Sequence, residues 1–324
     1  MRRPSPTAWL LVALFTVAAV SALDLRRVEG NTLVIYTTPA LKDVLEKAIV
    51  PGFEAETGIH VKLVYLAAGD EYYRVLMSRD RPEADVFLHA SPLYLEKGFA
   101  AGIFESHPGP PGTEQSDTPQ RRAPDGGQIW TAFAQSPLVE VYTPALAAPP
   151  DLALTPMRFG LPHPLLSNNG VYAAMFFETL DKEAGQRAVE HTVVQPTNAR
   201  ANIGGVADGS FDVTLGYEAV ASLYQKQGAK VAYTLPRIHG EDATTMVLFA
   251  AALVKNHPHP GGAQFIDHLF SASVQDQLAS VMLRPTVPGH AGAGLDLTGA
   301  RIIEYDWSMW ADLESALPAY QVKA

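Results

Sequence analysis

Short apolar runs alternate with helically spaced segments in the first third of the chain. The runs expected to form strands are residues 31–38, 59–66 and 84–89. Helices are expected at residues 40–57, 70–79 and 91–101, with Pro51 bending the first of them. This order predicts a mostly parallel sheet with helices on both faces.

A similar series returns after residues 107–128, which are rich in Pro and Gly and are expected to form a surface excursion without a core pattern. Further strands are expected at residues 129–134, 138–142, 192–195, 211–217, 230–235 and 244–254. Further helices are expected within residues 159–191 and at 199–209, 218–227, 258–270, 274–282 and 309–320.

Two such series predict an α/β protein of two lobes, each a mostly parallel sheet flanked by helices, with a hinge between them. We expect lobe one to comprise residues 31–134 plus 244–324, and lobe two residues 140–240. The chain should cross between the lobes near residues 132–142 and 240–250. Ligands of open α/β sheets bind beyond the carboxyl ends of the strands, so the cleft between the lobes is the expected site.

Residues 1–22 have the layout of a secretory signal peptide. Arg2 and Arg3 precede a charge-free apolar run at residues 8–20, and Val20-Ser21-Ala22 is a small-residue cleavage pattern. The run is shorter than the roughly 20 residues that a membrane-spanning helix needs. We expect export to a bacterial periplasm with cleavage near Ala22, and retention of the segment as an anchor is the alternative.

The composition narrows the classes of partner. Of the 324 residues, 47% are hydrophobic and 18% are charged, which suits a globular protein with a full core. The formal net charge is −10 and no long basic run occurs, so nucleic acid and acidic membrane surfaces are poor partners. The absence of cysteine excludes thiolate metal sites, cysteine nucleophiles and a lipid-anchoring cysteine.

The segment Ser167-Asn168-Asn169-Gly170 precedes an apolar helical stretch and has the residue types that cap a helix. A helix start presents N–H donors and the positive end of the helix dipole, so it can also bind an anion. An ordinary capped helix is the alternative. The position of this segment at the head of the second series, facing hydroxyl-rich loops of the first, favours the anion site.

The remaining candidate ligand-binding residues lie where strands end or helices begin. They are Thr37, Thr38, Ala90, Ser91, Arg200 and Tyr217. Hydroxyl, amide and backbone N–H donors can surround an oxyanion without a counter-cation. For Arg200, a bidentate contact to the anion and a plain surface position are both open.

Six segments carry a resemblance to one protein family. In order they are LVIYTT with FEAETGIHVKLVYLAAGD, ADVFLHASPLYLEKGFAAGIFE, GLPHPLLSNNGVY, ADGSFDVTLGYEAVASLYQKQGAKVAY, ALVKNHPHPGGAQFIDHLFSASVQDQLA and IIEYDWSMWADL. They resemble bacterial extracellular solute-binding proteins of the type II periplasmic class, in the branch of iron(III) and phosphonate receptors. The resemblance implies two lobes that close over a small ligand and dock on the permease subunits of an ABC importer, with no catalysis and no cofactor. We expect a monomer.

The resemblance also frames the choice of ligand. In its iron-binding members, a tyrosine pair at the start of the lobe-two helix holds ferric ion together with a His or Glu from lobe one, as suits a hard cation. This chain has only Tyr172 at that helix, and Tyr72-Tyr73 is expected to pack. We therefore expect no metal and a small anionic solute: a phosphonate, a phosphate ester or another oxyanion. Ferric iron is the alternative.

A secreted α/β hydrolase and a sensor domain are alternatives of other classes. A hydrolase needs a nucleophile–base–acid set or a metal triad, and the chain has neither G-x-S-x-G nor H-E-x-x-H, although His163 is near Ser167 in sequence. The segment His257-Pro258-His259-Pro260 is expected to be a solvated loop. If the ligand carries an amine, the acids available to pair with it are Glu218, Asp70 and Glu71.

Overall fold

The computed structural model describes residues 30–110, 113, 118–146, 148–154, 157–257, 259–290, 292 and 294–322. The signal segment expected at residues 1–22 lies outside these ranges. Within them, no helix is both long enough and apolar enough to cross a membrane.

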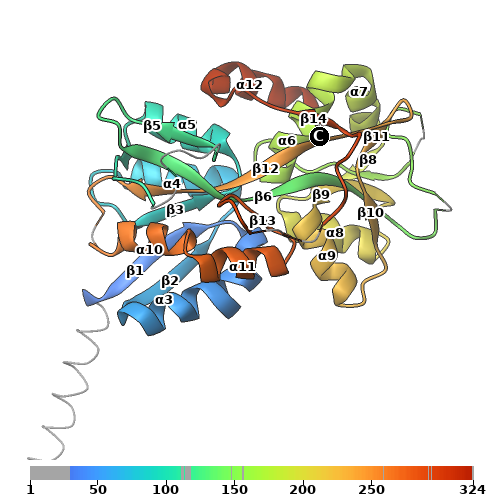
Figure 1. The fold of residues 1–324 in the computed structure, drawn as a ribbon. Helices are drawn as coiled ribbons and strands as arrows, with labels where there is room; N and C mark the ends of the chain where they lie inside the picture. The colour runs from blue at the N-terminus through green and yellow to red at the C-terminus, as the bar shows by residue number, and fades with distance from the viewer. Residues whose placement is uncertain are drawn as a thin grey trace, which may run out of the picture.

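One continuous sheet passes through both lobes, with the strand order β2-β1-β3-β12-β6-β9-β7-β8 (Figure 1). At one end β1 (Thr32–Thr37) pairs in parallel with β2 (His60–Tyr65) and β3 (Val86–His89). At the other end β7 (Phe159–Gly160) pairs in parallel with β8 (Thr192–Val194) and β9 (Val213–Tyr217). The expected α/β architecture of two lobes is therefore confirmed.

The helices of lobe one connect its parallel strands. They are α4 (Ala68–Met77), α5 (Pro92–Ala100) and a helical stretch made of η1 (Pro39–Leu41), α2 (Lys42–Val44), the π-helical turn η2 (Leu45–Ile49) and α3 (Val50–Thr57). The irregularity expected at Pro51 appears as the π-helical turn directly before α3, because a proline cannot donate the usual helical hydrogen bond. Gly58 ends the stretch with φ of 70°.

Two long antiparallel strands, β6 (Gln128–Tyr142) and β12 (Glu241–Val254), join the lobes. β12 pairs with β3 near its carboxyl end, whereas the second half of β6 pairs with β9. The sequence analysis divided β6 into two runs around Pro137, and the structure instead has one strand. Pro137 is opposite Met246 at the end of the ladder with β12, and it lies between the residues that pair with β13 (Arg284–Pro285) and those that pair with β9, so its missing N–H does not break the strand.

The segment at residues 107–128 contains more structure than its composition suggested. Residues Gln120–Arg122 form β5, which pairs with the start of β6, and His107 forms an isolated bridge with Gln128. Strand β4 (Phe104–Glu105) directly precedes the segment and pairs with β12. Strand β5 was therefore missed by the sequence analysis, although its three residues are not buried.

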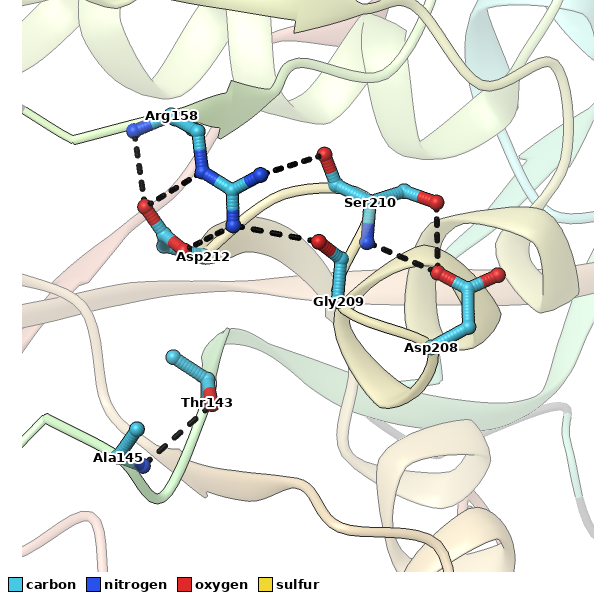
Figure 2. Close-up of polar contacts among 7 residues, drawn as sticks. All are labelled: Thr143, Ala145, Arg158, Asp208, Gly209, Ser210 and Asp212. Atoms are coloured by element: carbon cyan, nitrogen blue, oxygen red, sulfur yellow. Dashed lines mark hydrogen bonds and ion pairs between the residues drawn. The ribbon is translucent and has the colours of Figure 1, made fainter.

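Lobe two surrounds β7, β8 and β9 with four helices and two short strands. These are α6 (Asn168–Leu180), α7 (Lys182–Glu190), α8 (Ala199–Ala207), α9 (Glu218–Lys226), β10 (Ala232–Thr234) and β11 (Arg237–Ile238). Figure 2 shows how the amino ends of β7 and β9 are held together: the Arg158 guanidinium forms an ion pair with Asp212 at 2.7 Å and donates to the carbonyl groups of Gly209 and Ser210. This clamp fixes the strand ends that point away from the other lobe.

The C-terminal segment returns across the molecule. It comprises α10 (Gly262–Leu269), α11 (Ala272–Ser280), β13, β14 (Arg301–Ile303), η3 (Trp307–Met309), α12 (Trp310–Ala316) and η4 (Leu317–Tyr320). Helix α12 contacts α5 of lobe one and α6 of lobe two, and Figure 1 shows it lying across both. The lobe boundaries stated above stay a prediction.

We expect Gly170→Ala to lower the free energy of unfolding by about 1–3 kcal/mol. An added Cβ would lie 2.1 Å from the His163 carbonyl oxygen and 2.8 Å from that of Pro162, so the backbone has to move. Gly204→Ala in α8 is the matched control, because its nearest neighbouring atom is 3.7 Å away. At that position we expect alanine to raise the free energy of unfolding by about 0.5–1 kcal/mol. Urea denaturation measures both, and equal effects at the two positions would contradict this packing.

Candidate functional site

A small cavity lies where the two lobes meet, at carboxyl ends of strands and starts of helices. Its volume is about 10 Å³, close to the space that one water molecule requires. Lobe one contributes Thr38, Pro39, Leu66, Ala67 and Ala68, and lobe two contributes Leu166, Ser167, Asn168, Asn169, Thr197, Asn198, Ala199 and Tyr217. We call this place the interlobe site.

Direct hydrogen bonds close the lobes over one another here. The N–H of Ala68, at the start of α4, donates to the Leu166 carbonyl over 3.1 Å. The Tyr94 hydroxyl donates to the Leu165 carbonyl over 3.1 Å. A ligand of several atoms can therefore enter only when the lobes separate.

Ser167 occupies the position before the first residue of α6 but does not cap it with its side chain. Its backbone is extended, with φ of −119° and ψ of 131°, and its carbonyl accepts from the N–H of Gly170 over 2.9 Å. Its hydroxyl is buried and has no hydrogen-bond partner among the described residues. The hydroxyl therefore remains available beside the free N–H groups of the helix start.

The lobe-one candidates divide into free and occupied groups. The hydroxyls of Thr37, which ends β1, and Ser91, which precedes α5, are buried without a partner in the described structure. The Thr38 hydroxyl instead accepts from the N–H of Ala40 over 3.4 Å. Ala90 is fully buried and offers only its backbone.

Three polar side chains of lobe two converge on the cavity from α6 and β9. Tyr217 ends β9, and burial raises the pKa of its hydroxyl well above the usual 10.0, so the group stays a neutral donor. This hydroxyl, Asn168 Oδ1 and Asn169 Oδ1 are buried and lack partners within the ranges that the structure describes. Gly170 follows Asn168 and Asn169 in α6, and its Cα packs against the backbone of Pro162 and His163.

Arg200 is bonded to lobe one. Its Nε donates to the Pro39 carbonyl over 3.1 Å, and its guanidinium forms an ion pair with Asp43. The residue lies in the first turn of α8, and the Tyr224 hydroxyl donates a hydrogen bond to its backbone carbonyl over 3.1 Å. Arg200 thus links the lobes at the edge of the interlobe site, and its contact with a ligand stays a prediction.

A buried acid and a buried histidine lie beside the lobe-one half of the site. Glu71, one turn into α4, is fully buried, and burial alone raises the pKa of its carboxyl well above the usual 4.5. Its Oε2 lies 3.8 Å from His89 Nε2. Burial lowers the pKa of His89 to about 4, and its ring nitrogens contact Ser91 N and the Ala68 carbonyl. Burial therefore favours the uncharged form of both groups.

The other two acids considered for an amine are placed differently. Glu218 is buried, but its carboxylate accepts from the N–H of Leu295 over 2.5 Å and forms an ion pair with Arg284. Asp70 is exposed on α4. Of the three acids, only Glu71 is buried with both carboxyl oxygens unpartnered in the described residues.

The tyrosines considered for ferric iron make protein contacts. The Tyr172 hydroxyl accepts from the N–H of Leu248 in β12 over 3.0 Å. Tyr72 and Tyr73 surround the Lys97 ammonium, with ring centroids at 4.9 and 5.5 Å. In the part of the chain that the structure describes, no group of three or more His, Asp or Glu residues is placed to hold a metal.

The hydrolase alternative lacks a nucleophile–base contact. His163 Nδ1 accepts from the N–H of Leu165 over 3.2 Å, and the His163 carbonyl, not its ring, contacts Ser167. In the expected loop, the His257 ring contacts nearby residues. Its Nδ1 lies 2.6 Å from the His259 carbonyl oxygen, and its Nε2 lies 3.4 Å from Glu105 Oε1.

Several residues of the interlobe site were missed from the sequence. They are Pro39, Leu66, Ala67, Ala68, Leu166, Thr197, Asn198 and Ala199, which line the cavity, together with Asn202, which like Asn169 donates to the Leu215 carbonyl. Asn198 caps α8 by accepting from the N–H of Ala201 over 2.9 Å, so the rule that selected Ser167 could have found it. The apolar residues carry no chemical signal.

A larger groove of about 570 Å³ runs along β12 and β14 beside Trp307, and it contains none of the candidate residues.

A family model described as bacterial extracellular solute-binding protein matches residues 33–280. No curated protein sequence matches the chain.

Solved structures of periplasmic binding proteins superpose on most of the chain. AfuA from Actinobacillus pleuropneumoniae, solved with fructose-6-phosphate, has a TM-score of 0.74 and 17% identity over 88% of this chain and 96% of its own. The Trichodesmium protein IdiA (FutA), solved with iron and citrate, has a TM-score of 0.63 and 21% identity, over 90% of this chain and 100% of its own. The sulfate-binding protein SubI from Mycobacterium tuberculosis has a TM-score of 0.62 and 22% identity, over 80% of this chain and 88% of its own. At these identities the likeness establishes the fold, which is that of the two-lobed type II periplasmic binding proteins.

We expect Glu71→Gln to gain stability relative to the wild type as the pH rises above about 4.5. The unfolded chain releases the Glu71 proton near pH 4.5, whereas the raised pKa keeps the proton bound in the native state. Native protein then binds more protons than unfolded protein, so wild-type stability falls as pH rises, by up to about 1.4 kcal/mol per pH unit. Glutamine removes this dependence.

Chemical denaturation at several pH values measures this difference. Glu183→Gln is the control, because the Glu183 side chain is 92% exposed and should show no such trend. Parallel pH curves for Glu71→Gln and the wild type would contradict the buried neutral carboxyl.

Proposed function

Because the chain belongs to the bacterial extracellular solute-binding protein family, we propose that it is the periplasmic receptor of an ABC importer that captures a small oxyanion between its lobes. Phosphonates, phosphate esters and related oxyanions are the ligands considered. After closure over the anion, the receptor would dock as a monomer on the permease subunits and release its cargo. The family and the superposed structures are binding proteins, which supports a role without turnover.

One observation carries the choice of ligand: buried polar atoms without a described partner gather around the interlobe site. They belong to Thr37, Glu71, Ser91, Ser167, Asn168, Asn169, Asn202 and Tyr217. A buried polar group without a partner costs about 1–3 kcal/mol. A ligand that accepts from the hydroxyls and from the N–H groups of the α6 start removes much of this cost, so ligand and closure stabilise each other.

The donors are those expected of a site for an anion. The hydroxyls of Ser167 and Tyr217 border the cavity together with the start of α6. Burial raises the pKa of the Glu71 carboxyl, which favours its neutral form, and a neutral carboxyl does not repel an anion. The tyrosines that an iron site needs are bonded elsewhere. A thermal-shift screen against phosphonates, phosphate esters, molybdate, tungstate, thiamine, polyamines and ferric citrate tests the proposal. Stabilisation or visible colour with ferric ion alone would overturn it.

We expect Ser167→Ala to weaken binding of the anion found in that screen by about 5- to 100-fold while leaving the stability of the unliganded protein unchanged. Its hydroxyl makes no bond to other described residues that the change could remove. Ser271→Ala is the matched control: the Ser271 hydroxyl caps α11 by accepting from the N–H of Val274. That change should cost about 1 kcal/mol of stability and leave affinity intact. Calorimetric titration and urea denaturation measure the two effects, and the opposite pattern would contradict the site.

We expect Arg200→Ala and Asp43→Ala each to weaken binding about two- to fivefold, with the double variant no weaker than either. The ion pair joins the lobes, so its loss lowers the population of the closed, binding-competent state. Lys47→Ala is the control, because Lys47 pairs with Asp43 within lobe one. A loss with Arg200→Ala but none with Asp43→Ala would show instead that the guanidinium contacts the anion.

A further inference from the structure

Two asparagine side chains beneath the interlobe site are fixed with their oxygens free. Asn169 Nδ2, from α6, and Asn202 Nδ2, from α8, each donate to the Leu215 carbonyl over 3.4 Å. Rotating either amide by 180° would bring its oxygen against that carbonyl, so the orientation is set by the strand. Asn169 lines the cavity, and Asn202 is fully buried behind it.

The two amide oxygens are therefore acceptors in need of a donor. Asn169 Oδ1 and Asn202 Oδ1 are both buried and find no partner in the ranges covered by the structure. An oxyanion such as sulfate or molybdate has only acceptor oxygens, and it would leave both amide oxygens without a donor. A buried acceptor without a donor costs affinity, and sites with such groups reject ligands that cannot supply the donor.

We propose that the ligand is an anion that carries its own hydrogen-bond donor, a hydroxyl or an ammonium group, and that Asn169 is the residue that selects for it. This inference rests on the proposed function and narrows its ligand class. The anionic end would meet the hydroxyls of Ser167 and Tyr217 and the N–H groups at the start of α6. The donor of the ligand would meet the Asn169 oxygen. Because the closed cavity has room for about one water, such a ligand enters with the lobes apart.

The experiment compares ligands that differ only in the donor, by calorimetric titration of the mature protein. One arm uses 2-aminoethylphosphonate against ethylphosphonate, and the other uses glycerol 3-phosphate against propyl phosphate. Sulfate and molybdate complete the set. We expect the donor-bearing member to bind about tenfold or more tightly than its partner in at least one arm, and the arm identifies ammonium or hydroxyl.

Asn169→Ala should reduce that ratio to near one, whereas Asn31→Ala should retain it. Asn31 Nδ2 also donates to a backbone carbonyl, that of Gly58 at 2.8 Å, but Asn31 directly precedes β1, at the opposite end of that strand from Thr37. The ratio compares two ligands on the same protein, so it is independent of how much of the variant is folded. Leu215 keeps its bond from Asn202 in the Asn169 variant.

Two results would overturn the inference. If sulfate or molybdate binds more tightly than every donor-bearing anion, or if Asn169→Ala leaves the ratio unchanged, the amide oxygens do not select the ligand and the proposed function still stands. If no anion in the set binds at all, the proposed function fails together with the inference.

Discussion

A polar group buried without a hydrogen-bond partner costs about 1–3 kcal/mol, and the arrangement of the interlobe site depends on that cost. The helices that start at Ala68 and Asn168 and the strand that ends at Tyr217 bring their free polar ends to one place. The contact between the lobes buries these ends without supplying protein partners for all of them in the described residues. The site is therefore suited to a ligand with its own polar atoms.

The two long strands make such closure possible. β6 and β12 run through both lobes, and a register shift between Phe249 and Ala250 interrupts their pairing near the middle. A bulge of this kind bends the strands and increases their local twist, and we propose it as the position of the hinge. Direct contacts then hold the closed state, including the Ala68 N–H to the Leu166 carbonyl and the ion pair of Arg200 with Asp43.

Much of this architecture follows from the sequence, because strand and helix periods are local properties. The start of α6 at Ser167–Gly170 was predictable from cap residues, and so were the strand ends at Thr37 and Tyr217. The continuity of β6 was not, because Pro137 signals a break unless the neighbouring ladders are known. The partners of Arg200 and the convergence of Asn169 and Asn202 on Leu215 depend on packing between segments distant in sequence, which no local pattern encodes.

The same limit applies to Glu71. The sequence shows two adjacent acids on an expected helix, and the sequence analysis did not separate Glu71 from Asp70. The structure places Asp70 in solvent and Glu71 in the interior beside His89. The helical spacing of Ala68, Glu71 and Val75 places Glu71 on the buried face of α4, whereas its position beside His89 of β3 depends on tertiary packing.

The most direct test of the central claim measures the separation of the lobes. The chain has no native cysteine, so spin labels can be placed at Met77→Cys, where Met77 is 86% exposed on α4, and at Lys226→Cys at the end of α9. Pulsed dipolar spectroscopy should show a broader and longer distance distribution without ligand and a single shorter distance at a saturating concentration of the bound anion. A distribution that does not change on saturation would contradict capture by closure of the two lobes.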